Sequence, residues 1–62
     1  LKKYYGQTVT IVADNGEVFC GIVDTYFFPD DNENDLESII LRTSNGHLYE
    51  FTEEEIKTIE TI

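Results

Sequence analysis

Two side chains in this 62-residue sequence could act as a nucleophile and its base, namely Cys20 and His47. A cysteine attacks as its thiolate, and a neighbouring histidine can take up the thiol proton. However, Cys20 lies within an apolar stretch, and cysteine is among the residues most often buried in cores. His47 directly follows an Asn-Gly pair that is typical of a tight turn. We therefore expect Cys20 to pack in the interior, His47 to be an exposed turn residue, and the protein not to be an enzyme.

A metal site is the second chemistry that the residues suggest. Asp30, Asn32 and Asn34 have the spacing of the first ligands of an EF-hand calcium loop. The sixth position of such a loop needs glycine and the twelfth needs glutamate, but Asp35 and Leu41 stand there. A structural zinc site is also disfavoured, because the chain has a single cysteine and a single histidine. We expect neither a metal nor a cofactor, and we interpret residues 30–37 as a solvated loop.

The charge is strongly acidic, with 13 Asp and Glu residues against 4 Lys and Arg residues and a net charge of −9. No basic residue lies between Lys3 and Arg42. Nucleic acids and anionic membranes both bind proteins through Lys and Arg, so both are unfavourable partners. The carboxylates could instead imitate nucleic-acid phosphates. An acidic, nucleic-acid-mimicking inhibitor of a basic protein is therefore one functional alternative.

Aromatic residues form the candidate interaction surface, because such side chains are enriched where proteins recognise partners. Three of them are consecutive in Tyr26-Phe27-Phe28, and Tyr4 and Tyr5 accompany this run. Side chains along a strand alternate between its two faces, so at least one aromatic ring of the run should be exposed. The run either recognises a partner or covers an open end of the fold, and both interpretations stay open. The candidate surface consists of Tyr26, Phe27, Phe28, Tyr49 and Phe51.

Five short strands are expected to position these side chains. Alternating apolar and β-branched residues predict strands at residues 7–13, 17–28, 38–43, 47–51 and 57–62. The segments 14–16 and 44–46 each end in Asn-Gly and predict hairpin turns. Gly21 marks the place where the long second strand can bend. Thr52 and Glu55 have the spacing of a capping box, which predicts a single helical turn before the last strand.

The strand register follows from the length of each turn. A three-residue loop at 44–46 places Leu41 opposite Tyr49 and keeps one face of the hairpin apolar, whereas a two-residue loop would place Leu41 opposite Glu50. The three-residue loop is therefore preferred. The first turn stays open between two alternatives. A three-residue loop buries Val9, Ile11, Phe19 and Val23 and leaves Val12, Val18, Cys20 and Ile22 outside; a two-residue loop buries Val18, Cys20 and Ile22.

The spacing of the glycines and the apolar residues resembles that of the Sm-like (LSM) family over nearly the whole chain. The residues that carry the resemblance are Gly6, Val9, Ile11, Gly16, Phe19, Gly21, Val23, Ile56 and Ile59. The spacing of these residues along short strands with two Asn-Gly turns predicts a small closed β-barrel, and the length of the chain allows one domain, over residues 1–62. The resemblance implies an all-β fold, a five-stranded, strongly bent barrel of SH3-like type with a short N-terminal helix.

The sequence departs from the Sm-like pattern at the positions that bind RNA in that family. The family's Asp position falls near Phe27, and no Asn lies where the third strand begins. Its Arg-Gly or Lys-Gly position is occupied by residues around Phe51, Thr52 and Glu53, where carboxylates replace the cation. The resemblance therefore carries over the fold and not the RNA site, and residual RNA binding is the least favoured function.

The sequence as a whole predicts a non-enzymatic binding or assembly module. A chain this short builds a small core and usually needs disulfides, a metal or self-association. The single cysteine rules out a disulfide within the chain and is typical of the reducing cytoplasm. We expect a cytoplasmic homo-oligomer with no apolar run that could span a membrane. As in Sm-like proteins, its copies would join through edge strands 47–51 and 57–62.

Overall fold

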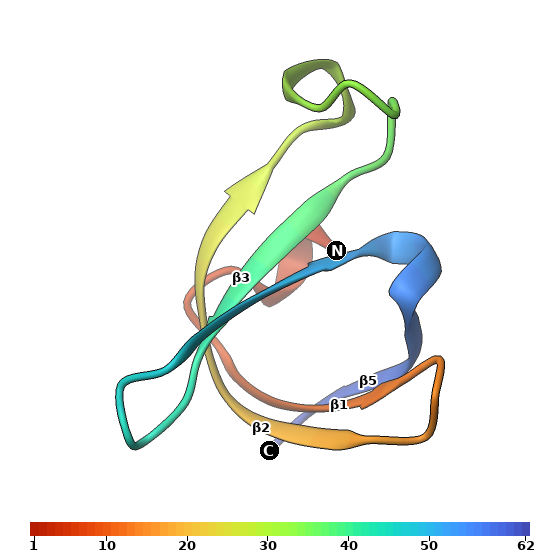
Figure 1. Cartoon of the computed structure of the whole chain (residues 1–62). Helices are drawn as coiled ribbons and strands as arrows, with labels where there is room; N and C mark the ends of the chain where they lie inside the picture. Colours follow the sequence, from red (N-terminus) through yellow and green to blue (C-terminus); the bar gives the residue numbers. More distant parts are fainter.

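The computed structural model describes all of residues 1–62, and its five strands form one antiparallel sheet (Figure 1). The strands are β1 (Thr8–Ala13), β2 (Val18–Phe27), β3 (Ser38–Arg42), β4 (Leu48–Thr52) and β5 (Ile56–Thr61). The only helical elements are three short 3₁₀ turns, η1 (Lys2–Tyr4), η2 (Pro29–Asp31) and η3 (Glu53–Glu55). None of these turns has the length and apolar character needed to cross a membrane. The structure confirms the predicted all-β fold with one helical turn before the last strand.

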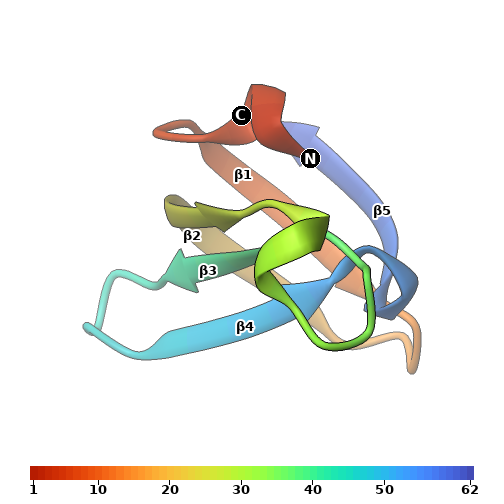
Figure 2. The same ribbon diagram turned by 90° about the horizontal axis from the view of Figure 1, so that it is seen from above.

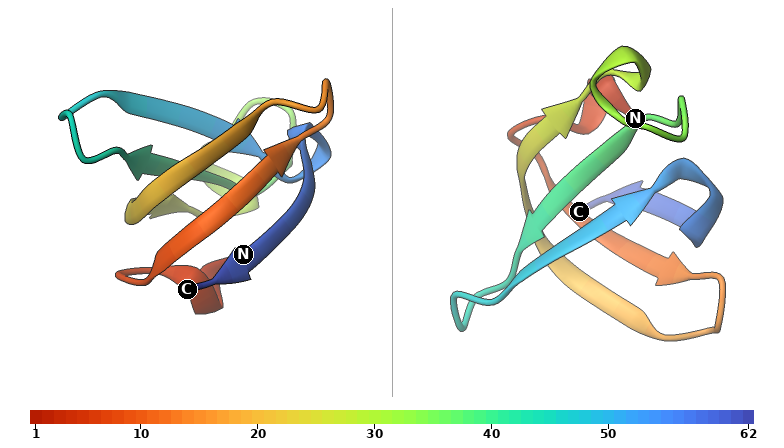
Figure 3. Two further views of the ribbon diagram at one scale, coloured as in Figure 1. Left: turned by 90° about the horizontal axis from the view of Figure 1, so that it is seen from below. Right: turned by 45° about the horizontal axis from the view of Figure 1, so that its top comes forward.

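The strand order is β4-β3-β2-β1-β5, so β4 and β5 are the two edges of the sheet. The sheet curls strongly, and η3 leads the chain from one edge to the other (Figure 3). However, β5 pairs with β1 and not with β4, so the hydrogen-bonded ladder does not close into a ring. The expected closed barrel is therefore a bent sheet with an open seam between β4 and β5.

The bend lies in β2, which belongs to both halves of the sheet. Its first part pairs with β1 as far as Ile22, and its second part pairs with β3 from Ile22 onward. A β-carbon on Gly21 would lie 2.4 Å from the carbonyl oxygen of Arg42, so only glycine allows this close approach. The register with β3 then shifts by one residue at Asp24, which is a β-bulge that bends the strand further.

Both hairpin turns contain three residues. The Ala13 N–H donates to the Glu17 carbonyl at 2.8 Å, and the Thr43 N–H donates to the His47 carbonyl at 2.9 Å. The last residue of each loop, Gly16 or Gly46, has a positive φ of 90° or 84°. The first hairpin thus adopts the three-residue alternative. The predicted register of the second hairpin is confirmed, because Leu41 lies opposite Tyr49.

The core lies on the concave side of the sheet. Its buried residues are Val9, Ile11, Ala13, Val23, Ile39, Leu41 and Phe51. The register of the first hairpin turns the alternate residues of β2 to the outside, where Val18 and Ile22 are exposed. Cys20 faces outward with them, opposite Thr10, and is also exposed. The expectation that Cys20 packs in the core was wrong, because the loop length decides which face of β2 is buried.

The predicted capping box is present in η3. The Glu55 carboxylate accepts hydrogen bonds from the Thr52 backbone N–H at 3.0 Å and from the Thr52 hydroxyl at 3.1 Å. The Glu53 N–H also donates to the Glu37 carbonyl at 3.0 Å. These bonds hold the crossing segment between β4 and β5 against the loop that precedes β3.

Candidate functional site

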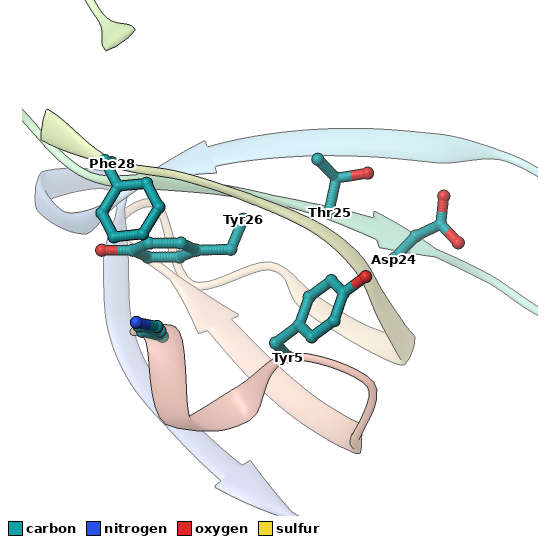
Figure 4. Close-up of a pocket in the computed structure, with 6 residues that line it drawn as sticks. Tyr5, Asp24, Thr25, Tyr26 and Phe28 are labelled. Atoms are coloured by element: carbon teal, nitrogen blue, oxygen red, sulfur yellow. The ribbon is translucent and has the colours of Figure 1, made fainter. Parts of the chain in front are cut away.

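A hollow of about 350 Å³ lies between η1 and the end of β2 (Figure 4). We call it the aromatic groove. Three of its six lining side chains are aromatic rings, and the others include one cation and one carboxylate. The lining residues are Lys2, Tyr5, Asp24, Thr25, Tyr26 and Phe28. A hollow of this size with aromatic walls and few polar groups has the character of a binding site.

The aromatic groove forms because the N-terminal segment folds back onto the end of β2. The Gly6 N–H donates to the Val23 carbonyl at 2.9 Å, and the Val23 N–H donates to the Gln7 carbonyl at 3.0 Å. This corner places Tyr5 beside β2, where its side chain faces the groove (Figure 4). Tyr5 and Phe28 are 61% and 50% exposed, so two large rings that line the groove are open to solvent. Exposed aromatic rings grouped in this way are typical of recognition surfaces.

Tyr26 forms the floor of the groove, and two contacts fix the orientation of its ring. Its ring lies 5.1 Å from that of Phe28, in a T-shaped arrangement. Its hydroxyl donates to the Glu37 carboxylate at 2.9 Å. Burial and this hydrogen bond both raise the pKa of Tyr26. The pKa of Glu37 lies below its usual range, first because of the hydrogen bond from the Leu1 ammonium and also because of the bond from Tyr26.

Glu37→Gln is expected to lower stability at neutral pH and to weaken its dependence on acid pH. A carboxyl whose pKa is lower in the folded state stabilises the fold above its unfolded pKa of about 4.3. That contribution is lost as the pH falls through the folded pKa of Glu37. Urea unfolding measured between about pH 7 and pH 2 should therefore show a shallower acid slope in the variant. Glu33→Gln on the same loop removes the same charge and is the matched control; equal slopes for both variants would contradict the role of Glu37.

One cationic side chain, Lys2, and one anionic side chain, Asp24, line the aromatic groove. The Lys2 ammonium lies 5.1 Å from the centre of the Phe28 ring, a cation–π distance. Asp24 lines the groove near Tyr5 (Figure 4) and pairs with Arg42 at 3.5 Å. Both members of that pair are about half exposed, so the ion pair is weak and exchangeable. The groove can therefore bind an apolar group and accept a cationic group beside it.

The structure separates the five predicted surface residues. Tyr26 and Phe28 lie together in the groove, whereas Phe27 points to the opposite face of β2 and does not line it. Tyr49 and Phe51 belong to another cluster, in which their rings lie 5.0 and 5.1 Å from the ring of Phe19. Phe51 in that cluster is part of the core. The candidate surface is thus two aromatic clusters, of which the first borders a hollow and the second extends the core.

Three residues of the groove were not predicted from the sequence: Lys2, Asp24 and Thr25. Tyr5 was noted only as a companion of the aromatic run. Asp24 and Thr25 reach the groove through the bulge in β2, and no local pattern in the sequence marks that bulge. The hydrogen bond from the Gly6 N–H to the Val23 carbonyl, which helps to form the groove, also joins segments that are far apart in the sequence. The one available signal was the cluster of two tyrosines directly before Gly6.

The residues considered for catalysis and for metal binding lie elsewhere. His47 is exposed in the turn before β4, as predicted, with its ring 6.3 Å from that of Tyr49. Asn32 donates its side-chain amide to the Leu36 carbonyl at 2.7 Å and to the Ser38 hydroxyl at 3.2 Å. The Asn34 side chain accepts from the Leu36 N–H at 3.1 Å. Both amides therefore serve to order the loop.

Most of the carboxylates gather on one side of the molecule. We call this side the acidic face; it consists of the loop 30–37, η3 and the turn 14–17, which together carry ten of the 13 acidic residues. These segments adjoin one another, because the Glu37 N–H donates to the Glu53 carboxylate at 3.2 Å and the Asp14 N–H donates to the Glu55 carbonyl at 2.8 Å. Figure 2 shows them on the side opposite the β3–β4 turn.

Comparisons of the chain with protein families, with curated proteins and with solved structures found no match.

Proposed function

We propose that this protein is a non-enzymatic binding and assembly module whose copies join head to tail, β4 of one copy pairing with β5 of the next. The observation that carries the proposal is the strand order, which leaves β4 and β5 as two free edges of one sheet. Free strand edges pair readily with other strands. The resemblance to Sm-like proteins, which join through these strands, supports the same assembly.

The backbone groups that could form such a pairing can be assigned from the alternation of an antiparallel ladder. Thr43 bonds to His47 in the second hairpin, so Leu48 and Glu50 direct their backbone N–H and C=O groups away from β3. The Ile62 N–H bonds to the Thr8 carbonyl, so Thr61 directs its groups away from β1. Each edge thus offers donors and acceptors to a partner strand.

The side chains at the two edges favour association at moderate salt. Leu48 in β4 is 60% exposed, and Ile62, directly after β5, is 76% exposed. Lys57 on β5 and Glu50 on β4 carry opposite charges. Each copy nevertheless has a net charge of −9, so whole copies repel one another at low ionic strength. Association should therefore strengthen as salt is added.

Proline substitutions at the two edges test the direction of pairing. Glu50→Pro and Thr61→Pro each remove one outward N–H and leave the ladder within the chain intact. Each variant alone is expected to be a monomer, because every β4–β5 contact then includes a blocked edge. An equimolar mixture is expected to form a heterodimer, because Glu50→Pro retains its β5 edge and Thr61→Pro retains its β4 edge. Light scattering coupled to size-exclusion chromatography measures the masses.

The unmodified protein at several salt concentrations provides the control. It should grow in mass between about 0.02 and 0.5 M NaCl, over which the Debye length shortens roughly fivefold. A monomeric mass at every protein and salt concentration would contradict the proposal. A dimer of Thr61→Pro by itself would instead show that two β4 edges pair with each other.

The acidic face supports a second candidate function, inhibition of a basic nucleic-acid-binding protein. An inhibitor that imitates nucleic-acid phosphates needs its carboxylates on one continuous face. Ten of the 13 acidic residues lie on the acidic face. Capture of partners from a cell extract, followed by competition with duplex DNA, tests this function. A DNA-binding protein that DNA displaces from the bait would support it. Replacing Glu53, Glu54 and Glu55 by Gln should then weaken capture, whereas Glu60→Gln, away from that face, should not.

A further inference from the structure

The end of β2 is a third free strand edge, and it borders the aromatic groove. We infer that the aromatic groove binds an extended, basic peptide segment of another protein, which adds a short strand to β2 at Tyr26. The inference goes beyond the proposed assembly, because neither β4 nor β5 takes part in it. It depends on the direction of the Tyr26 backbone, on the two exposed rings and on the charge of the surrounding surface.

The direction of the Tyr26 backbone follows from the pairing of β3 with both of its neighbours. Thr43 bonds to His47 and the Glu53 N–H bonds to the Glu37 carbonyl, so the odd-numbered residues of this segment face β4. The even-numbered residues of β3 therefore face β2. Their partners in β2 are Thr25 and Phe27, while Tyr26 lies opposite Ile39. The backbone N–H and C=O of Tyr26 consequently point away from β3.

No strand covers that side of β2 beyond Val23. The pairing of β1 with β2 ends where Thr8 lies opposite Ile22. Gln7 and Gly6 still bond to Val23, and the chain then turns away at Gly6, where φ is 77°. Tyr26 thus borders a groove rather than a neighbouring strand. One residue of an extended peptide can exchange two hydrogen bonds with it, as strand addition requires.

The groove provides side-chain contacts next to this edge. An apolar residue of the peptide can lie between Tyr5 and Phe28, the two exposed rings on its walls (Figure 4). The ring of Tyr26 is already held by Glu37, so its orientation needs little ordering when a peptide binds. Truncation of the exposed rings of Tyr5 and Phe28 should weaken peptide binding most.

The net charge of the whole protein and the Asp24 carboxylate at one end of the groove favour a basic peptide, while Lys2 contributes a cation at the other end, beside Phe28. Asp24 lines the groove and its bond to Arg42 is exposed and exchangeable, so an incoming Arg or Lys side chain can replace Arg42. The net charge of −9 attracts basic peptides and repels acidic ones at long range. The same field disfavours nucleotides, which could otherwise stack on the rings of Tyr5 and Phe28.

Titration of the ¹⁵N-labelled Glu50→Pro variant with defined peptides tests the inference without a free β4 edge. The probe is acetyl-Arg-Thr-Val-Leu-Val-Arg-amide, added to about 1 mM, a concentration that detects weak complexes. We expect the Tyr26 amide signal to shift and its hydrogen exchange to slow. The same peptide with Glu in place of both Arg residues should bind at least about tenfold more weakly. Replacing its central Leu by Pro, which removes a donor, should also weaken binding.

Side-chain variants separate groove binding from binding elsewhere. Tyr5→Ala and Phe28→Ala should each weaken binding by about tenfold. Val18→Ala removes a 64% exposed side chain from the same strand outside the groove and should leave binding unchanged. An unshifted Tyr26 amide, equal binding of the acidic peptide, or shifts confined to Ile59 and Thr61 would overturn the inference. So would groove shifts caused by adenosine monophosphate in the absence of any peptide effect. None of these results depends on whether the protein self-associates.

Discussion

Gly21→Ala is expected to unfold a large share of the molecules at room temperature. The added methyl group would lie 2.4 Å from the Arg42 carbonyl oxygen and 2.9 Å from the carbon of that carbonyl. Both atoms belong to the backbone of the β3 end, so they can move aside only if β2 and β3 separate. Overpacking of this kind costs about 3 kcal/mol. A core of this size rarely supplies more than about 3–5 kcal/mol, so the loss is close to the whole stability.

Urea unfolding followed by circular dichroism measures the loss, and Gly46→Ala is the matched control. A β-carbon on Gly46 would meet no atom within 4 Å, although its φ of 84° is unfavourable for alanine. That substitution should cost only about 1–2 kcal/mol. If both variants lost the same stability, the close contact with Arg42 would not be the reason for glycine at position 21.

Ile11→Ala is expected to cost about 3 kcal/mol, the usual range for truncating a buried isoleucine. Ile11 is 0% exposed, and its strand is flanked on both sides, by Phe19 in β2 and by Ile59 in β5. The cavity therefore opens where both hairpins meet the core. Few other buried residues exist to compensate, since the core consists of seven side chains. The midpoint of urea unfolding should fall to near zero denaturant.

Ile22→Ala provides the control, because it removes the same atoms from a side chain that is 38% exposed on the outer face of β2. Its cost should stay below about 1 kcal/mol. The difference between the two variants tests the register of the first hairpin directly. A two-residue loop would bury Ile22, so the larger loss would then come from Ile22→Ala.

The strands and turns were predictable because their determinants are local. Asn45-Gly46 and the apolar alternation on either side of it identify the second hairpin, and the requirement for one apolar face selects its register. Thr52 and Glu55 identify the capping box by spacing alone. The structure agrees with each of these predictions.

The first hairpin shows where local patterns stop being sufficient. β2 carries apolar side chains on both faces, so either loop length would bury a plausible set of residues. The choice depends on β3 and β4, whose residues Ile39, Leu41 and Phe51 pack with Val9, Ile11 and Val23 in one core and thereby determine which face is inside. The exposure of Cys20 is a consequence of that choice.

The amino-acid pattern alone therefore determined the number of strands, the two turns, the bend at Gly21 and the excess of carboxylates. Three further features arise only in the folded chain: the ladder stays open between β4 and β5, Tyr5 and Asp24 meet beside Tyr26, and the carboxylates share one side. The two sets of features differ in the sequence distance over which their determinants act. Turns and alternation depend on neighbouring residues, whereas an open seam, a groove and a charged face depend on pairings between segments far apart in the chain.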